Sequence, residues 1–314
     1  MNYLITGGTG TFGHECTRQL LALKDTDRLV IFSRDEFKQQ EMAERFTDSR
    51  IRFFIGDVRD KERLLRAFHG IQVVFHAAAL KQVPSCEYNP REAVLTNIFG
   101  AMNVIEAAID CGVERVMALS TDKAVAPVNL YGATKLCAEK LFVRANGYAS
   151  GTATRFSVVR YGNVIGSRGS LFAKTSTGVE FRLTHPEMTR FATSPEQAVR
   201  FVLDCLHIMQ GGEIFVPKLS AFRVVDAMRQ MTATGNIEIT GMRPGEKIHE
   251  TLIGPDEQGV REYDHFFIIE PLNPSWTYKR LYIGSSFSRD KCNWYTSKDL
   301  LSPDALRLVG DPNV

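Results

Sequence analysis

The feature that most constrains the fold is a glycine-rich turn that joins an apolar run to an amphipathic segment at the start of the chain. Residues 3–6 predict a short buried strand, and the segment after the turn predicts a helix that ends near Leu23. Glycines at this spacing allow a tight turn, close approach of a pyrophosphate to the backbone, and close packing of helix on sheet. The first turn of the helix would offer free amides to phosphates; a glycine-rich turn without a ligand is the alternative. The residues expected at a dinucleotide here are Gly7, Gly10, Thr11, Phe12 and Gly13.

Strands and helices alternate through the first half of the chain. Further strands are predicted at 28–32, 52–55 and 73–76, and an apolar run at 113–119 adds another. Strict alternation predicts an α/β fold of the Rossmann type, a doubly wound parallel sheet with ligands at the carboxyl ends of its strands. The residues at these ends that we expect to contact a cofactor are Ser33, Arg34, Lys38, Asp57, Val58, Ala77, Ala78, Ala79 and Lys81.

The end of the second strand indicates which dinucleotide binds. NAD-preferring folds place an acid there to hold the ribose, whereas this chain has Ser33 and Arg34, with Lys38 close behind. These residues predict the 2′-phosphate of NADP, although Asp35 is adjacent. Asp57, after the third strand, is placed either to hydrogen-bond the adenine amino group or to cap the helix that starts near residue 60.

Three polar residues around the fourth strand have two interpretations each. His76 is interpreted as a satisfied core histidine in preference to a ligand. Lys81 is either a surface lysine or a partner of a ribose or nucleotide phosphate. Asn97, in a helix predicted over 90–111, is either a helix-surface amide or a group that holds the active-site loop.

A phenol and an ammonium share one helix face after the fifth strand. Tyr131 and Lys135 lie four residues apart in a helix that is expected to begin at Asn129. A cation beside a phenol favours the phenolate, so the pair could supply a base near neutral pH. A half-buried aromatic beside a solvated lysine is the alternative. The run 120–123, Ser-Thr-Asp-Lys, ends the preceding strand and makes an active site the better interpretation.

Composition excludes several classes of protein. The 314 residues include 38 basic and 36 acidic ones, a formal charge of +2 without charged blocks, so no nucleic-acid partner is expected. The six cysteines lack metal-site spacing and are interpreted as reduced thiols, and no metal is expected. No signal peptide or membrane span is recognised, which predicts a cytoplasmic protein without a membrane partner.

These motifs together resemble the extended short-chain dehydrogenase/reductase family. More narrowly, they are similar to its inverting UDP-N-acetylglucosamine 4,6-dehydratases, whose membrane-bound retaining relatives carry another residue in place of Tyr131. The resemblance implies a lyase that uses NADP to form a UDP-4-keto-6-deoxy-hexosamine from a UDP-sugar, serves pseudaminic acid biosynthesis, and assembles as a homodimer or hexamer. The matching strings are residues 33–38, 76–81, 120–123, 129–135, 160–163, 188–191, 212–217 and 243–249.

The resemblance also implies roles for the central residues. Tyr131 takes the 4-hydroxyl proton, Lys135 holds the tyrosinate and the nicotinamide ribose, and Thr121 donates to the developing oxyanion. Lys123 removes the carbon 5 proton, and Asp122, protonated, supplies a proton to the departing 6-hydroxyl. Lys123 must then be neutral at some point, which burial and the cation at Lys135 would favour.

The nucleotide-sugar is expected in a second lobe. By resemblance, its partners are Lys81, Asn163, Val164, Arg190 and Arg243. The segment 167–190 is shorter than the family pattern, so the hexosamine is less certain than the reaction. We expect a Rossmann domain of residues 1–162 plus 190–218 and a substrate lobe of residues 163–189 plus 219–314, with helices at 172–177, 195–209 and 302–309.

Two other functions compete with the dehydratase. An NADP-linked nucleotide-sugar epimerase or dehydrogenase would leave Asp122 and Lys123 without a task. A non-catalytic NADP-binding regulator would be expected to lack Tyr131 or Lys135, and both are present.

Overall fold

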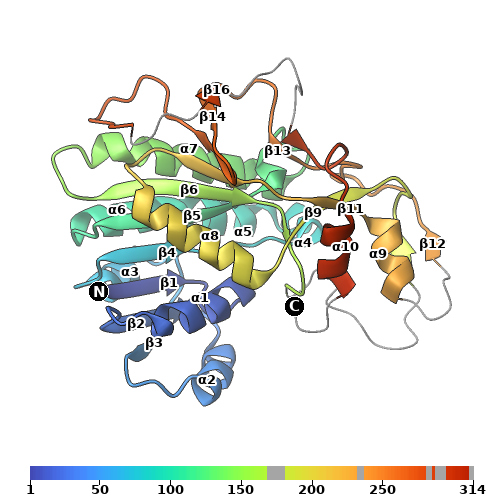
Figure 1. Ribbon diagram of the computed structural model, residues 1–314. Coiled ribbons are helices and arrows are strands. Elements are labelled where there is room, and N and C mark those ends of the chain that lie inside the picture. Colours follow the sequence, from blue (N-terminus) through green and yellow to red (C-terminus); the bar gives the residue numbers. More distant parts are fainter. Residues whose placement is uncertain (168–180, 232–236, 281–284, 287–294, 311–314) are drawn as a thin grey trace.

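A large twisted sheet forms the centre of the computed structural model, which describes residues 1–167, 181–231, 237–280, 285–286 and 295–310. Its seven parallel strands are β1 (Asn2–Thr6), β2 (Arg28–Ser33), β3 (Ile51–Ile55), β4 (Val73–His76), β5 (Arg115–Thr121), β6 (Arg155–Tyr161) and β10 (Ile214–Pro217). Three antiparallel strands extend one edge, namely β15 (Phe266–Ile269), β14 (Val260–Glu262) and β16 (Ser285–Ser286). The order is β16-β14-β15-β10-β6-β5-β4-β1-β2-β3. From β1, strands β2 and β3 are added on one side and β4, β5 and β6 on the other, which confirms the predicted α/β fold (Figure 1).

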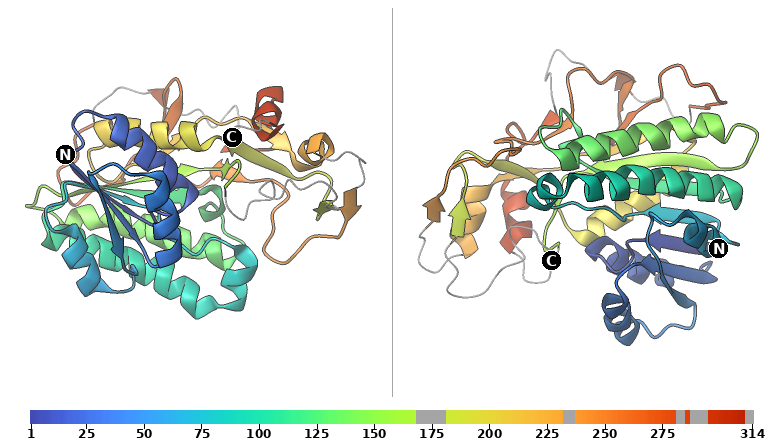
Figure 2. Two further views of the ribbon diagram at one scale, coloured as in Figure 1. Left: turned by 90° about the horizontal axis from the view of Figure 1, so that it is seen from below. Right: turned by 180° about the vertical axis from the view of Figure 1, so that it is seen from behind.

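Helices cover both faces of this sheet (Figure 2). One face packs against α1 (Thr11–Ala22), α2 (Glu36–Arg45) and α8 (Pro195–Ile208). The other face packs against α3 (Lys61–Phe68), α6 (Gly100–Asp110) and α7 (Leu130–Tyr148). Burial on both faces explains why the central strands are apolar along almost their whole length: all four residues of β4 and of β10 are buried.

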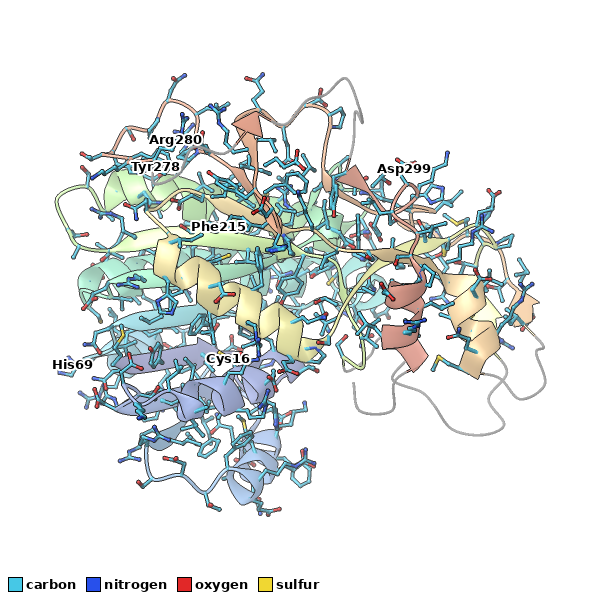
Figure 3. The ribbon with its side chains drawn as sticks, viewed as in Figure 1. Cys16, His69, Phe215, Tyr278, Arg280 and Asp299 are labelled. Atoms are coloured by element: carbon cyan, nitrogen blue, oxygen red, sulfur yellow. The ribbon has the colours of Figure 1, made fainter. Side chains whose placement is uncertain are left out.

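Two apolar clusters fill the layers between sheet and helices. The cluster beneath α1 and α8 includes Cys16 of α1 and Phe215 of β10, which are both fully buried (Figure 3). The cluster beneath α3, α6 and α7 includes Phe32, Phe68 and Phe142. Because the two layers are anchored on the same strands, the carboxyl ends of those strands form a rigid floor.

A smaller lobe lies beyond the carboxyl ends of the parallel strands (Figure 1). It contains a three-stranded sheet, a two-stranded sheet and two helices around a cluster that includes Met188, Phe222 and Met228. The elements are β7 (Asn163–Val164), β9 (Thr189–Thr193), β11 (Ala221–Arg223), β8 (Phe181–Leu183), β12 (Ile237–Ile239), α9 (Val224–Met231) and α10 (Pro303–Gly310). The final helix was predicted at 302–309; the helix predicted at 172–177 lies outside the described residues.

Part of the predicted substrate segment belongs to the large sheet. β15 pairs antiparallel with β10, with Ile214 opposite Ile269, and β14 pairs with β15. An exposed edge of β10 would leave backbone groups unpaired, and the apolar strand β15 covers it. The chain therefore returns to the large sheet after entering the lobe, and the division into two domains elsewhere stays a prediction.

The long helix predicted over 90–111 is one continuous run of three pieces. They are α5 (Pro90–Val94), the π-helical turn η1 (Leu95–Phe99) and α6. Among the described helices, this run, Pro90–Asp110, is the one that could cross a membrane by its length and mean hydropathy. It was not identified as a candidate from the sequence. Half of its most apolar window is buried inside the fold, where α6 packs on the sheet as a core helix does.

A buried arginine joins three separate segments of the chain. Arg160, at the end of β6, donates to both carboxylate oxygens of Glu139 in α7, at 2.9 and 2.7 Å, and to both of Glu257, at 2.8 Å each. It also donates to the Leu252 carbonyl of β13 (Thr251–Ile253) at 2.9 Å. Since these contacts satisfy every N–H direction of the guanidinium, the three segments meet in one geometry.

Replacing this arginine should be far more costly than replacing a surface one. Arg160→Met leaves the buried carboxylate of Glu139 and the partly buried carboxylate of Glu257 without their cation, so we expect a loss of roughly 3–5 kcal/mol in the free energy of unfolding. Arg200→Met, which removes an exposed ion pair with Glu196 on α8, should change it by less than about 0.5 kcal/mol. Urea denaturation of both variants measures the difference, and equal losses would contradict the assignment.

Candidate active site

A cavity of about 840 Å³ opens where the parallel strands end. Its wall contains every residue that the sequence predicted for cofactor or catalysis except Gly13, and every predicted substrate residue except Arg190. The predicted residues on the wall are Gly7, Gly10, Thr11, Phe12, Ser33, Arg34, Lys38, Asp57, Val58, Ala77, Ala78, Ala79, Lys81, Thr121, Asp122, Lys123, Tyr131, Lys135, Asn163, Val164 and Arg243.

The glycine turn is built for close approach. Gly7 has a φ of +65°, and a Cβ added there would lie 2.9 Å from the backbone of Ala78 in the loop after β4. A Cβ at Gly13 would lie 2.0 Å from the Gly8 carbonyl oxygen, so Gly13 packs α1 against the turn and does not line the cavity. The first turn of α1 therefore lies against the cavity with its free amides, a fit for the pyrophosphate of a dinucleotide.

The end of β2 carries the predicted selectivity residues. Ser33 is buried and accepts a hydrogen bond from Thr9 Oγ1 at 3.2 Å. Arg34 is more than half exposed, with a nitrogen 3.7 Å from an Asp57 carboxylate oxygen. Lys38 pairs with Asp35, whose side chain also caps α2. Both cations are thus at the cavity, each with one acidic neighbour.

Asp57 does not cap the following helix. Asp60 caps α3 by accepting from the Arg63 amide, whereas Asp57 accepts from the Arg59 amide and guanidinium. Burial raises the pKa of Asp57, but the hydrogen bonds from Arg59 outweigh burial and lower it. The capping alternative is therefore wrong, and an ionised Asp57 stands at the cavity wall.

The loop after β4 is held from beneath by buried polar groups. His76 shares a 2.9 Å hydrogen bond with Thr6 Oγ1, and burial lowers its pKa to about 3, which confirms a neutral core histidine. Asn97 is buried in η1, where it accepts from the Leu80 amide and donates to the Leu80 carbonyl and Thr134 Oγ1. Of the two interpretations of Asn97, the loop-holding one is confirmed, and the π-helical turn brings the amide to this place.

Tyr131 and Lys135 are both buried on the first turns of α7, whose N-cap is Asn129. Burial raises the pKa of Tyr131 to about 12, opposed by Lys123 and by a hydrogen bond with Thr121. Burial lowers the pKa of Lys135 to about 8. The expected lowering of the phenol pKa by Lys135 is wrong: the cation that acts on the phenol is Lys123, and burial outweighs it.

Lys123 is held between two buried carboxylates. Its Nζ lies 3.0 Å from Asp122 Oδ1 and 3.1 Å from Glu250 Oε1, and Thr121 Oγ1 donates to the same Asp122 oxygen at 2.9 Å. Burial lowers the pKa of Lys123, but the two carboxylates outweigh it and raise the pKa well above its usual value. At rest the lysine is an ammonium, contrary to the neutral form that burial and Lys135 were expected to favour.

Two of the residues predicted for the substrate are cations at the cavity wall. Lys81 is at the wall, and burial followed by the charge of Lys123 lowers its pKa. Arg243, paired loosely with Glu246, and Asn163 also line it. Arg190 differs from its expectation: it is absent from the wall, because its guanidinium donates to the backbone carbonyls of 189, 247 and 248.

Sequence reasoning missed several polar groups in or beside this cavity. Within the described part of the chain, Ser120 Oγ and Thr96 Oγ1 are buried at the wall without a hydrogen-bond partner. Glu250, behind Lys123, was also missed. It directly follows the matched string 243–249. That string indicated that the segment is important, but it did not indicate a contact with Lys123.

Comparison with known proteins is consistent with this geometry. The chain is 50% identical over 276 residues to a UDP-N-acetylglucosamine 4,6-dehydratase (inverting) of Campylobacter jejuni, covering 86% of this chain and 83% of that one. It is 42% identical over 265 residues to a UDP-glucose 4-epimerase of Rickettsia prowazekii, covering 81% and 78%. The solved structure of Pen from Bacillus thuringiensis, 37% identical, superposes with a TM-score of 0.86 over 98% of this chain and 95% of that one.

The family assignment follows from the extent of these matches. Residues 3–271 match the family described as polysaccharide biosynthesis protein, a range that includes the seven parallel strands of the large sheet from Tyr3 onwards and every residue of the cavity wall. With its extended short-chain dehydrogenase/reductase fold, the chain belongs to the polysaccharide biosynthesis protein family.

Proposed function

We propose that this protein is a UDP-N-acetylglucosamine 4,6-dehydratase that inverts carbon 5 and serves the first step of pseudaminic acid biosynthesis. The observation that carries the proposal is the ion pair of Asp122 and Lys123, 3.0 Å apart in the same cavity as Tyr131. Loss of water from carbons 5 and 6 needs one group that takes a proton and one that gives a proton, beside a group that starts the oxidation of carbon 4. The name of the C. jejuni relative agrees with this reaction.

The cofactor of this proposal is NADP. The turn after β1 fits a pyrophosphate, and Arg34 and Lys38 supply cations at the end of β2 for a 2′-phosphate. The chemistry that a bound nicotinamide supplies is reversible hydride acceptance, so the coenzyme leaves each turnover unchanged. In this proposal, Lys135, which lies one turn after Tyr131 in α7 and at the cavity wall, binds the nicotinamide ribose.

Tyr131 accepts the proton of the 4-hydroxyl. Because its pKa is about 12, the phenol holds its own proton at neutral pH and accepts another only as the first one leaves. The exit runs through the Thr121 hydroxyl, which hydrogen-bonds the phenol and donates to Asp122 Oδ1 at 2.9 Å. A proton that moves along this line leaves Asp122 protonated, which is the form that the next step requires.

Asp122 and Lys123 then carry out the loss of water. The ketone at carbon 4 acidifies the proton on carbon 5, which Lys123 removes, while Asp122 gives its proton to the 6-hydroxyl as that group leaves as water. Carbon 5 regains a proton on its opposite face, from Lys123 or from a water that it binds, and this inverts the centre. In this proposal, Lys81, Arg243 and Asn163 of the cavity wall bind the UDP-sugar.

An epimerase is the competing function, since the R. prowazekii relative carries that name. Removal and return of hydride at carbon 4 needs Tyr131 and Lys135 but no second acid and base. The buried ion pair of Asp122 and Lys123 would then be a desolvation cost without a chemical task, which favours the dehydratase.

We also propose a cytoplasmic enzyme that assembles as a homodimer or a multiple of it. α6 and α7 lie side by side on one face of the large sheet. The exposed apolar side chains on them and on the adjoining η1 are Phe99 at the end of η1, Met102 in α6 and Tyr148 at the end of α7. Apolar side chains on two neighbouring helices suit a symmetric contact with a second copy.

The product in heavy water tests the proposed reaction. After incubation with UDP-N-acetylglucosamine, mass spectrometry and NMR should show a 4-keto-6-deoxy sugar with deuterium at carbon 5 and inverted configuration there. NADPH absorbance should not accumulate, since each hydride removed is returned. Stoichiometric NADPH would identify a dehydrogenase, and a 4-epimer that keeps its 6-hydroxyl would identify an epimerase.

Two substitutions should separate the oxidation from the loss of water. Tyr131→Phe removes the group that accepts the first proton, so both hydride transfer and exchange at carbon 5 should disappear. Lys123→Met should leave a slow oxidation at carbon 4 but lower the loss of water by on the order of a hundred- to ten-thousand-fold. Deuterium exchange and single-turnover absorbance measure the two steps, and near-normal dehydration by the Lys123 variant would show that another group is the base.

Cofactor choice depends on the charge at Arg34. Arg34→Glu should weaken NADP binding by roughly ten- to a hundredfold and NAD binding much less, because only NADP carries the 2′-phosphate. Arg45→Glu, an exposed arginine at the end of α2 and away from the cavity, is the matched control. Calorimetric titration of both coenzymes measures the effect, and equal losses for NADP and NAD would exclude Arg34 as the phosphate partner.

A further inference from the structure

The protonated state of Lys123 conflicts with its proposed role as the base at carbon 5. A base must be neutral before it takes a proton, yet the two carboxylates hold this lysine as an ammonium. Asp122 cannot relieve it in the same turnover, because Asp122 receives the proton that arrives through Thr121 and must deliver that proton to the 6-hydroxyl. A second acceptor for the lysine proton is therefore needed within hydrogen-bonding distance.

We propose that Glu250 is this acceptor, a positioning residue that takes one proton from Lys123 before the lysine acts and returns it afterwards. The inference rests on the proposed function, which supplies the need for a base. In the step, the Nζ–H bond of Lys123 breaks and an O–H bond forms on Glu250; neutral Lys123 then takes the carbon 5 proton. When carbon 5 is protonated again and Glu250 gives its proton back, both groups return to their starting state and no proton is gained or lost.

The geometry of Glu250 suits this task. Oε1 lies 3.1 Å from Lys123 Nζ, within range for direct proton transfer. Oε2 is buried and has no hydrogen-bond partner among the described residues, so the carboxyl group is sparsely hydrogen-bonded. Asp122 Oδ2 is likewise buried without a partner among the described residues, but Asp122 must keep the proton that it delivers to the 6-hydroxyl, so Glu250 is the carboxylate that is left to receive the lysine proton.

The backbone of Glu250 is fixed by the C-terminal part of the chain. Its amide donates to Ser297 Oγ at 2.9 Å, and its carbonyl accepts from the Ser297 amide at 2.9 Å and from Thr296 Oγ1 at 3.1 Å. Ser297 is fully buried and also contacts Thr189 Oγ1 at 2.7 Å. These bonds hold the carboxylate against Lys123, which assigns a task to residues 296–297 that the sequence left without one.

Several other charges face this pair and set its protonation. Lys123 is faced by Asp122 from its own turn, by Tyr131 of α7, by Arg190 of β9 and by Lys81 after β4. Glu250 is faced also by Arg190, whose Nε lies 3.8 Å away, and by Lys247. Each surrounding cation opposes an extra positive charge on Lys123, so the two carboxylates alone keep it protonated, and removing one of them has a defined sign.

Replacing the carboxyl group tests the proposal. In Glu250→Gln, Lys123 can lose its proton only to solvent, so exchange at carbon 5 should fall by on the order of a hundredfold or more at neutral pH, while oxidation at carbon 4 persists. Because a solvent proton is then released, the residual exchange should rise with pH about tenfold per unit, whereas the wild-type rate is flat over the same range. KM for UDP-N-acetylglucosamine should stay near its wild-type value, since Glu250 does not line the cavity.

Two further variants serve as a conservative replacement and as a matched control. Glu250→Asp keeps an ionisable group and should restore part of the exchange and the flat pH profile, which a purely structural role would not do. Glu187→Gln removes an exposed carboxylate of the same lobe and should behave as wild type. Wild-type exchange with a flat profile in Glu250→Gln would overturn the proposal, as would a raised KM with an unchanged rate.

A readout without substrate separates this inference from the proposed function. The Cε resonance of Lys123, assigned through Lys123→Met, should titrate at lower pH in Glu250→Gln than in wild type, because removing a carboxylate lowers the pKa of the ammonium. If wild type fails to dehydrate the UDP-sugar and the resonance still moves, the proposed function is wrong but the coupling stands. If the resonance does not move, Glu250 is not the proton partner. Should Glu250→Gln fail to fold, Glu250→Asp should give a smaller shift of the same sign.

Discussion

The buried contact of Arg160 with Glu139 and Glu257 is the interaction on which the site geometry depends. It ties the end of β6 to the middle of α7 and to the segment that follows β13. A buried ion pair adds little net stability relative to a well-packed apolar core, but it permits only one arrangement of its partners. The same arrangement orients α7, which carries Tyr131, and the strand that follows Glu250, so one guanidinium sets the relative positions of two halves of the site.

The parallel sheet supplies the second constraint. Each parallel strand is followed by a crossover that must return on one face, so the strands end at one edge and the polar residues after them converge there. Local patterns predicted this part of the molecule well: β4 was expected at 73–76 and observed as Val73–His76, and α8 was expected at 195–209 and observed as Pro195–Ile208. A strand that is buried on both faces is easy to predict from the sequence, because nearly every one of its residues is apolar.

The features that the sequence did not predict depend on contacts between distant segments. The contact of Glu250 with Lys123 and the pairing of β15 with β10 join residues from different parts of the chain, and neither has a local signature. Arg190 was assigned to the substrate from its string alone, whereas backbone carbonyls of a neighbouring segment occupy its guanidinium. The charge state of Lys123 was misjudged for the same reason. The sequence indicated that Lys123 is buried, but it did not indicate that the Glu250 carboxylate lies beside it.

The protonation states of the site follow from how few charges it contains. Dehydration needs an acid and a base side by side, and an isolated pair of that kind exchanges its proton and becomes an ion pair, as Asp122 and Lys123 have done. Restoring the neutral lysine and the protonated aspartate then requires one proton delivered to Asp122 and one removed from Lys123. In the proposed mechanism, the substrate hydroxyl would deliver the first through Tyr131 and Thr121, and Glu250 would accept the second. Buried carboxylate oxygens without partners, as on Asp122 and Glu250, typically cost about 1–3 kcal/mol each, a cost that a site for hydride transfer alone would have no reason to carry.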